Sequence, residues 1–429
     1  MDYDEALAEL GRRTNREAHA GRLEGLTVEP MARLMDVLGD PHRAYPVIHI
    51  TGTNGKGSVA RMITAVLAEH GLTVGTYTSP HLRRVNERIS RNGEPIDDDA
   101  FAAMVTEIVE LSPLAGVEPS YFELLTAGAL SWFADGPVDV AVIEVGLLGR
   151  YDATNVVDGH VAVITSIGLD HTDGTGDWRA AVAWEKAGIV GEGTFLVLGE
   201  TDPELRPVFV DAAGDDLWVR DDDFGVTADS VALGGHLVDL YTPGSQIDDV
   251  VVPLHGAHQA DNAAIALAAV EAFFARPADA DVVRAGFAKV LAPGRFEVLR
   301  RSPLVIVDGA HNAPGAAAAA ATLADEFAVD GRRILVLGML AGPGRDVDAL
   351  LEAFDVAGAD AVVACAPDSP RAVPPEDIAA GARRLGTQAE VAESVAAAVA
   401  TALLAAEDDD VVLVTGSLHT VVEALDALA

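Results

Sequence analysis

The sequence Gly52-Thr53-Asn54-Gly55-Lys56-Gly57-Ser58 lies between an apolar run at residues 46–50 and a helical pattern at residues 59–70. A buried strand, a glycine turn and a helix start in this order form a cradle for phosphate, because backbone N–H groups and the positive end of the helix point at the same anion. Lys56 can reach the terminal phosphates of a nucleotide, and Ser58 can offer its hydroxyl to Mg²⁺. The segment therefore predicts an anion site.

The strict P-loop pattern fails at two positions. It requires glycine where the chain has Ile50, and a serine or threonine directly after the lysine, where the chain has Gly57. From these residues alone, an ordinary strand-to-helix turn remains the alternative to nucleotide binding.

Composition is typical of an acidic globular protein. The 429 residues, 50% of them hydrophobic, allow two or three domains with large cores. The 67 acidic and 29 basic residues give a formal charge of −38, which would repel nucleic acid and anionic membranes. Only Lys56, Lys186 and Lys289 are lysines. This balance favours a halophilic source, where salt screens self-repulsion; an acidic surface for a basic partner is the alternative.

Cysteine content and the N-terminus indicate a cytoplasmic protein. The single cysteine, Cys365, excludes an internal disulfide and fits a reducing compartment. The first residues are acidic and lack the apolar core of a signal peptide. No segment approaches the roughly 20 apolar residues that span a bilayer.

Strands and helices alternate through the first part of the chain. Strands are expected at residues 46–50, 73–78, 138–143, 161–167 and 194–200. This alternation predicts a parallel sheet with right-handed crossovers. Residues 211–253 predict a small antiparallel excursion, and residues 82–95 a long loop. The arginines of that loop are a candidate anion clamp, with surface pairing as the alternative: Arg83, Arg84, Arg88 and Arg91.

A second α/β series follows a hinge at residues 293–296. Its strands are expected at residues 304–307, 333–337, 361–364 and 411–414. We therefore expect an α/β protein with an N-terminal P-loop-type parallel-sheet ATPase domain, residues 1–295. A smaller Rossmann-like α/β domain follows, residues 296–429.

Polar residues follow several strands of the first series. Lys56, Ser79, Glu144 and His171 would all lie at the carboxyl edge of one parallel sheet, where open α/β folds bind ligands. A carboxylate, an imidazole and a hydroxyl beside a phosphate loop make an oxygen-rich Mg²⁺ site. Taken singly, Glu144 could cap a turn and His171 could be a hydrogen-bonded core histidine.

Ten segments of the chain together resemble the folylpolyglutamate synthase and dihydrofolate synthase enzymes of the Mur ligase superfamily. They are Ile50-Thr51-Gly52-Thr53-Asn54-Gly55-Lys56-Gly57-Ser58, Thr78-Ser79-Pro80-His81, Tyr121-Phe122-Glu123, Glu144-Val145-Gly146-Leu147, Asp152-Ala153-Thr154-Asn155, Leu169-Asp170-His171-Thr172, Glu185-Lys186-Ala187-Gly188-Ile189, Pro293-Gly294-Arg295-Phe296, Asp308-Gly309-Ala310-His311-Asn312 and Thr415-Gly416-Ser417-Leu418. Two positions depart from the family: Leu148 stands where glycine is usual, and Pro314 comes one residue late.

The resemblance implies a reaction and its residues. ATP phosphorylates a substrate carboxylate, the amino group of L-glutamate attacks the acyl phosphate, and phosphate leaves. Catalytic roles fall on Lys56, Lys186, His171 and Glu144. ATP contacts fall on Gly52, Thr53, Asn54, Gly55, Lys56, Gly57, Ser58, Asn262, Arg295 and Asp308. Metal ligands are Ser79, Glu144, His171 and Lys186, the last as a carbamate holding a second Mg²⁺.

The scarcity of lysine gives that last assignment some independent support. A position needing only positive charge would hold arginine in this chain, so a retained lysine suggests a chemical role. A salt-bridged surface lysine is the alternative, and the neighbouring Glu185 could be the ligand instead.

Substrate residues also follow from the resemblance. Tyr121, Phe122, Asp152 and Ala153 belong to the pterin or folate site. His311 and Ser417 belong to the glutamate site. We expect a monomeric, bifunctional enzyme that uses ATP, L-glutamate, and dihydropteroate or reduced folate, with K⁺ as a further candidate ion. The alternatives are a Mur-type ligase that glutamylates another cofactor and a non-catalytic nucleotide-binding regulator.

Overall fold

The computed structural model describes residues 1–15, 27–169, 172, 174–343 and 345–429. Its largest sheet has the strand order β4-β3-β2-β5-β1-β6-β7-β8. The strands are β1 Val47–Thr51, β2 Val74–Tyr77, β3 Ile89–Arg91, β4 Glu94–Pro95, β5 Val140–Glu144, β6 Gly159–Ile164, β7 Phe195–Leu198 and β8 Leu217–Val219. All pairs among β2, β5, β1, β6, β7 and β8 are parallel, as the alternation of strands and helices predicts.

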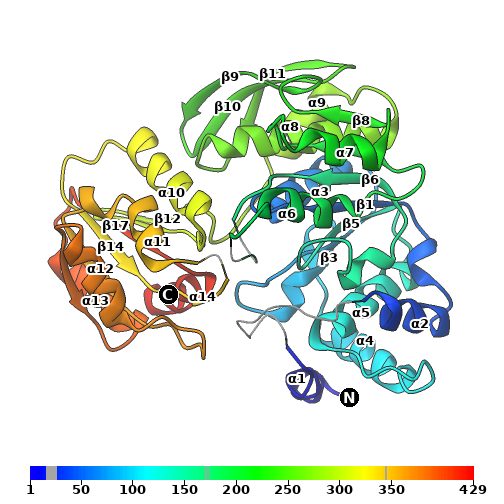
Figure 1. The fold of residues 1–429 in the computed structure, drawn as a ribbon, viewed down its shortest axis with the longest axis horizontal. Helices are drawn as coiled ribbons and strands as arrows, with labels where there is room; N and C mark the ends of the chain where they lie inside the picture. Colours follow the sequence, from blue (N-terminus) through cyan, green and yellow to red (C-terminus); the bar gives the residue numbers. More distant parts are fainter. Residues whose placement is uncertain (16–26, 170–171, 173, 344) are drawn as a thin grey trace.

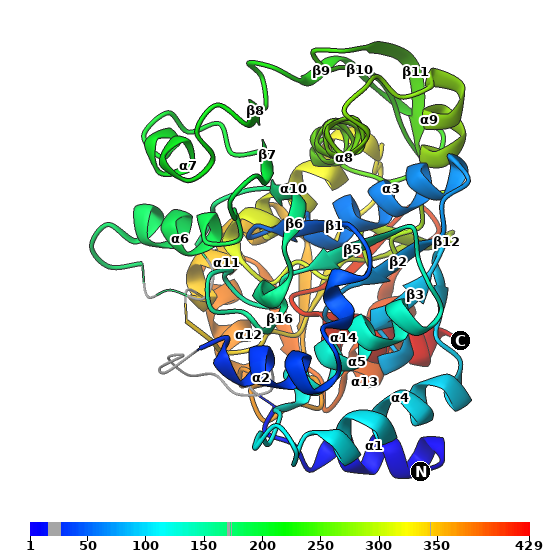
Figure 2. The same cartoon turned by 90° about the vertical axis from the view of Figure 1, so that its right-hand side faces the viewer.

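Helices cover both faces of this sheet (Figure 2). They are α1 Tyr3–Gly11, α2 Glu29–Val37, α3 Lys56–Glu69, α4 Asp98–Leu111, α5 Tyr121–Asp135, α6 Trp178–Ala187, α7 Arg206–Ala213, α8 His258–Phe274 and α9 Ala280–Phe287, with short 3₁₀ turns at Pro41–Arg43, Val85–Arg88 and Ala153–Val156. Side chains alternate along β1, so Ile48 and Ile50 join the core beneath α3 and α8, whereas Val47 joins the core with α4 and α5.

The predicted antiparallel excursion is confirmed with shifted bounds. Strands β9 Gly225–Ala232, β10 Gly235–Tyr241 and β11 Gln246–Val252 form a separate sheet, drawn at the top of Figure 1. Its inner face packs on α8 and α9, where Val238 and Leu240 are buried. The start of the predicted segment differs: it holds the end of α7 and then β8, which pairs in parallel with β7.

The second α/β series forms a six-stranded sheet in the order β12-β13-β17-β14-β15-β16. Its strands are β12 Glu297–Arg301, β13 Leu304–Val307, β14 Arg333–Leu337, β15 Ala361–Ala364, β16 Gln388–Val391 and β17 Val411–Thr415. Its helices are α10 Ala313–Glu326, α11 Val347–Ala353, α12 Pro375–Arg384, α13 Val395–Ala405 and α14 Leu418–Leu428, with a 3₁₀ turn at Val356–Gly358. The four predicted strands are confirmed; β12, which is antiparallel to β13, and β16 were not predicted.

The prediction of a long loop at residues 82–95 is wrong. A 3₁₀ turn and β3 and β4 occupy it, and β3 pairs antiparallel to β2. The predicted clamp of four arginines is not formed as a unit: Arg83 and Arg88 line the large cleft described below, but Arg84 pairs with Asp98 at 2.6 Å and the Arg91 guanidinium lies 3.6 Å from the Trp132 ring centroid. Surface pairing and stacking therefore account for Arg84 and Arg91.

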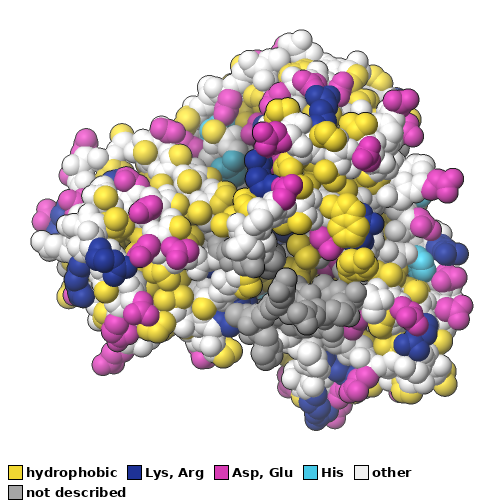
Figure 3. Space-filling model, in the orientation of Figure 1, with side chains coloured by type: hydrophobic (Ala, Val, Ile, Leu, Met, Phe, Trp, Pro, Cys, Tyr) yellow, Lys and Arg dark blue, Asp and Glu magenta, His cyan; other side chains and the backbone are white. Residues whose placement is uncertain are grey.

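The eight-stranded sheet and the six-stranded sheet occupy opposite halves of the molecule in Figure 1, and residues 293–296 join them. We call the half with the eight-stranded sheet the first half and the half with the six-stranded sheet the second half. Acidic side chains are scattered over the face drawn in Figure 3 and do not gather in one patch. Among the described residues, no helix combines the length and apolar character needed to cross a membrane.

Candidate active site

A cleft of about 1480 Å³ is lined by residues from both halves of the molecule. It brings together most of the predicted site residues: Thr53, Asn54, Gly55, Lys56, Gly57, Ser58, Ser79, Tyr121, Phe122, Glu144, Asp152, Ala153, Asn262, Arg295, Asp308, His311 and Ser417. Gly52 and Lys186 are not among the described residues that line it. His171 lies outside the described residues.

The glycines of the phosphate loop are required by close contacts. Gly52 and Gly55 have φ angles of +149° and +86°, which side chains rarely adopt. A Cβ at Gly52 would lie 1.8 Å from Oγ1 of Thr165, and one at Gly55 would lie 2.5 Å from Oδ1 of Asn262. The turn therefore places Asn262 of α8 against the loop, and α3 begins at Lys56 instead of residue 59.

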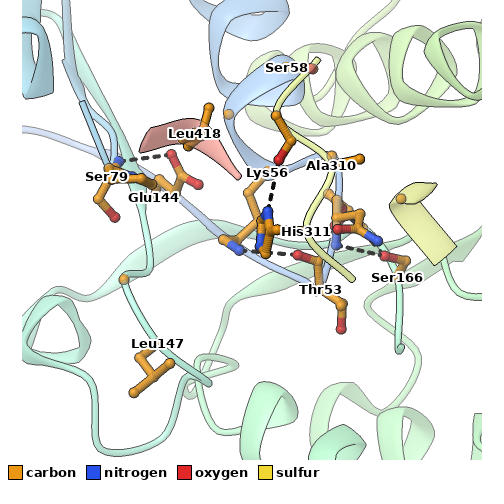
Figure 4. Close-up of a pocket in the computed structure, with 18 of the residues that line it drawn as sticks. Thr53, Lys56, Ser58, Ser79, Glu144, Leu147, Ser166, Ala310, His311 and Leu418 are labelled. Carbon is orange, nitrogen blue, oxygen red and sulfur yellow. Dashed lines mark hydrogen bonds between the residues drawn. The ribbon is translucent and has the colours of Figure 1, made fainter. Parts of the chain in front are cut away.

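Lys56 is positioned at the N-terminus of α3. Its ammonium donates to the carbonyls of Gly52, at 3.1 Å, and Thr53, at 3.4 Å. Figure 4 shows Lys56 between the pair Ser79 and Glu144 on one side and His311 on the other. A cation, a helix N-terminus and glycine backbone in one place suit the binding of phosphate.

Glu144 and Ser79 come from the ends of neighbouring strands. The N–H of Ser79 donates to Oε2 of Glu144 at 3.1 Å, and Glu144 is 3% exposed. Burial raises the pKa of the Glu144 carboxyl, while the charge of Lys56 opposes that rise. A Cβ at Gly57 would lie 3.6 Å from the same oxygen, so the carboxylate reaches the phosphate loop.

This pair fits a hard divalent cation. A buried carboxylate and a serine next to a phosphate loop are oxygen donors of the kind that Mg²⁺ takes. The described residues hold no cluster of three His, Cys, Asp or Glu side chains suited to a metal. The remaining predicted ligand of the first ion, His171, falls outside them.

Lys186 lies near the end of α6 and is 4% exposed, so it is not a surface lysine. Its neighbour Glu185 lines the cleft, and burial raises the pKa of that carboxyl against the charges of Arg150 and Lys186. The loop after Glu144 packs on this helix end, since a Cβ at Gly149 would lie 2.8 Å from the Glu185 carbonyl oxygen.

Asp152 shapes the wall near the predicted pterin residues. Its carboxylate accepts hydrogen bonds from the N–H groups of Thr154, at 3.0 Å, and Leu147, at 2.8 Å. Burial raises the pKa of Asp152, and the Thr154 hydrogen bonds oppose the rise. The pinned loop lets the Phe122 ring pack on Gly146, where a Cβ would lie 2.4 Å from the ring.

Residues from the half with the six-stranded sheet line the other side of the cleft. Asp308 accepts from the N–H groups of Phe296, at 2.9 Å, and Ala310, at 2.8 Å, so its carboxylate organises the segment after the hinge. His311 Nδ1 donates to the Gly309 carbonyl at 2.9 Å.

Ser417 is 1% exposed and caps α14, where it accepts the N–H of Thr420 at 3.1 Å. It therefore has a structural role at the edge of the cleft.

Sequence reasoning missed three side chains in this site. Thr165 and Ser166 follow β6; the Thr165 hydroxyl donates to the Asn54 carbonyl at 2.6 Å, and Asn54 N–H donates to the Ser166 hydroxyl at 3.2 Å. Their position directly after a buried strand is the signal that could have found them. Arg220, paired with Asp261 at 2.5 Å, also lines the cleft, and no local pattern marked it.

Comparisons with known proteins agree with this geometry. The family model of the Mur ligase glutamate ligase domain matches residues 294–418. The dihydrofolate synthase/folylpolyglutamate synthase of Mycobacterium tuberculosis is 44% identical over 91% of this chain and 87% of its own length. A probable bifunctional folylpolyglutamate synthase/dihydropteroate synthase of Haloferax volcanii is 41% identical over 92% of this chain and 48% of its own length.

Solved structures of folylpolyglutamate synthases are similar to this protein over its whole chain. The M. tuberculosis folylpolyglutamate synthase complexed with ADP and AMPPCP superposes with a TM-score of 0.91 at 39% identity, covering 100% of this chain and 99% of that one. A bifunctional folylpolyglutamate synthase/dihydrofolate synthase with Mn, AMPPNP and L-glutamate bound has a TM-score of 0.86 at 31% identity, covering 100% and 98%.

Proposed function

The chain belongs to the dihydrofolate synthase/folylpolyglutamate synthase family of Mur ligases, and we propose from this premise that it joins L-glutamate to a pterin or folate carboxylate with ATP. The γ-phosphate passes to the acceptor carboxylate, which leaves ADP and an acyl phosphate. The amino nitrogen of glutamate attacks the acyl carbon, phosphate leaves, and the amine loses a proton. The observation that carries the proposal is one cleft lined by a phosphate loop from one sheet and polar residues from the other.

The protein contributes mainly position and charge to these steps. The backbone N–H groups of residues 52–58 and the ammonium of Lys56 hold the phosphates, and Arg295 adds a cation from the hinge. Holding ATP, acceptor and glutamate in one cleft makes each attack effectively intramolecular.

We assign the divalent cation to Ser79, Glu144 and His171. When bound, Mg²⁺ would neutralise charge on the transferring phosphate. We propose two Mg²⁺ ions, with K⁺ as a candidate activator that a comparison of KCl with NaCl in the assay tests.

We assign the second ion to Lys186 as a carbamate, formed when its neutral amine adds CO₂ and releases a proton. Lys186 is buried, and the product of the addition is an anion with two oxygens, which suits Mg²⁺. Lys186→Arg should then be as inactive as Lys186→Ala, because arginine stays protonated. A labelled-CO₂ carbon resonance present in the parent and absent in Lys186→Ala would establish the carbamate; full activity of Lys186→Arg would refute it.

For the substrates, we propose the pterin end at Tyr121, Phe122, Asp152 and Ala153, and glutamate at His311 and Ser417. The contacts above make Asp152 and Ser417 supports of these walls more than direct ligands. We place the domain boundary between residues 295 and 296. Because one chain completes the cleft, we propose a monomer, and the single buried Cys365 suits the cytoplasm.

Phosphate release with dihydropteroate, tetrahydrofolate or neither, each with labelled glutamate, tests the function. Labelled amide from both acceptors supports a bifunctional enzyme. Amide from neither, with phosphate release only when another carboxylate is supplied, would indicate a ligase for a different cofactor. ADP binding without any amide product would indicate a regulatory protein.

A further inference from the structure

Two carboxamides join the phosphate loop to the second half of the molecule. Nδ2 of Asn54 donates to Oδ1 of Asn312 at 3.2 Å, and Nδ2 of Asn312 donates to Oδ1 of Asn54 at 3.0 Å. The two residues are 258 positions apart in the chain. Asn312 is 1% exposed, whereas Asn54 is partly exposed where it lines the cleft.

The orientation of both amides is determined by a third contact. Oδ1 of Asn312 caps α10 by accepting the N–H of Gly315 at 2.9 Å, which identifies that atom as the oxygen. The other terminal atom of Asn312 is then the NH₂ group, and it faces Asn54 as a donor. Asn54 must turn its own oxygen toward that group.

Among the described residues, the hydrogen bonds between the first half of the molecule and Asn54 all involve the Asn54 backbone. Its carbonyl accepts the Thr165 hydroxyl at 2.6 Å, and its N–H donates to Ser166 at 3.2 Å. The side chain is bonded to Asn312 instead, so both halves of the molecule hold residue 54. Pro314, also at the start of α10, lies close to Gly168 of the first half. A Cβ at Gly168 would lie 3.5 Å from the Pro314 ring and 3.2 Å from the Thr53 side chain.

We propose that Asn312 is a positioning residue for ATP: the second domain, through Asn312, sets the conformation of Asn54 and so completes the phosphate loop. The inference rests on the proposed ATP site and adds a residue that need not touch the nucleotide. Loss of the pair leaves the Asn54 carboxamide without its shielded partner, so nucleotide has to order the loop when it binds. Affinity for nucleotide should fall although every loop residue is intact.

Asn312→Ser separates this role from helix capping. Serine is as good an N-cap as asparagine, so α10 keeps its first hydrogen bond, but the shorter side chain cannot reach Asn54. ADP affinity, measured by calorimetry, should fall about tenfold, as expected for losing one or two hydrogen bonds between neutral groups. The melting temperature should stay at that of the parent.

A double-mutant cycle tests the coupling directly. Asn54→Ser should lose a similar factor, and Asn54→Ser with Asn312→Ser should bind ADP no worse than the weaker single variant. Asp426→Asn is the control, because Asp426 pairs with Arg83 at 3.4 Å, an exposed contact between the same two halves. It should bind ADP like the parent.

Three outcomes would overturn the inference. Parent-like ADP affinity of Asn312→Ser would leave Asn312 as a helix cap only. Losses that multiply in the double variant would show that Asn312 does not act through Asn54. An equal loss in Asp426→Asn would make the effect general to any contact between the halves. If the parent itself bound no ADP, the proposed function would fail first and this inference with it.

Discussion

The backbone N–H of Ser79 meets the carboxylate of Glu144 at 3.1 Å, although 65 residues separate them in the chain. Ser79 follows β2 and Glu144 ends β5, and these two neighbouring strands are parallel. This contact holds a buried carboxyl group beside the loop that carries Lys56. Substitution of Glu144 therefore tests the proposed ligands of the divalent cation.

Glu144→Gln should reduce ligase turnover by at least about a hundredfold and raise the Mg²⁺ concentration needed for half-maximal activity. The amide oxygen can still accept from Ser79, so the fold is kept while the charge for the cation is lost. Glu107→Gln is the matched control, because the Glu107 carboxylate is partly buried and accepts a hydrogen bond from Ser131 outside the cleft. An unchanged Mg²⁺ dependence in Glu144→Gln would return this carboxylate to a capping role.

Lys56→Ala should abolish turnover and leave the melting temperature nearly unchanged. Among the described residues, its ammonium donates hydrogen bonds to two backbone carbonyls, so little structure depends on it, whereas phosphate binding loses a cation. Lys289→Ala is the control, since Lys289 pairs with Glu69 on the surface. Near-normal turnover of Lys56→Ala would refute the phosphate site.

The elements that sequence predicted well share a local cause. Buried parallel strands are short apolar runs, so β13, β14 and β15 were predicted to the residue. Parallel direction then placed Ser79 and Glu144 at one edge, which their hydrogen bond confirms. By contrast, β3 is a three-residue strand of mixed polarity between β2 and the edge strand β4, and its pairing of Ile89 with Tyr77 depends on tertiary contacts.

The site itself was predicted less completely. The pairing of Asn54 with Asn312 depends on how two separate sheets dock, which no local pattern contains. The sequence predicts that Asp152 binds the pterin or folate and that Asp308 binds ATP. In the structure, their carboxylate oxygens accept hydrogen bonds from backbone N–H groups. A capping carboxylate and a ligand carboxylate look alike in sequence, because the difference lies in turn geometry.

Leu148 adopts φ +60°, a left-handed conformation that costs a leucine roughly 1–2 kcal/mol. Leu148→Ala should be destabilised, because it keeps this strain and loses the side chain. Leu148→Gly should be more stable than Leu148→Ala by about 1 kcal/mol, the reverse of the usual order of these residues. Urea unfolding of the two variants measures the difference; a less stable glycine variant would contradict it.

The protein should need salt for stability. A charge of −38 distributed over the surface repels itself, and molar salt shortens the screening length to about 3 Å. The melting temperature should rise steadily from 0.1 M to about 2 M in both KCl and NaCl. Sucrose at equal osmolality serves as the control for general exclusion effects. A melting temperature that is independent of salt would remove the halophilic interpretation.

A cluster of two histidines and two carboxylates joins the three-stranded sheet to α10. His236 bonds Asp229 through Nδ1 at 2.6 Å and Glu326 through Nε2 at 2.9 Å, and both partners accept only, so His236 carries both protons. Glu326 also accepts from His255 at 2.7 Å. His258 is the further titratable group near this cluster. The cluster therefore ties the two halves of the molecule through a charged imidazole.

The stabilisation from this cluster should depend on pH with a definite sign. Burial acts to lower the pKa of His236, but the hydrogen bonds to Glu326 and Asp229 outweigh it and raise that pKa above 6.5. Burial acts to raise the pKa of Glu326, but the hydrogen bonds from His255 and His236 lower it below 4.5. The contribution of His236 is complete below pH 6.5 and declines as the pH rises through its raised pKa; that of Glu326 is complete above pH 4.5 and declines in acid.

We therefore expect His236→Gln to be less stable than the parent by about 2 kcal/mol at pH 6, the effect of a hydrogen bond to a charged group. The difference should shrink as the pH is raised toward 9, because the parent loses its own imidazolium. Urea unfolding in molar salt at a series of pH values measures it, and His160→Gln, at a histidine outside the cluster, serves as the control. Glutamine does not titrate between pH 5.5 and 9, so any pH dependence of the stability difference comes from the parent. A stability difference that stays constant over this range would therefore show that His236 acts through its shape and not through its charge.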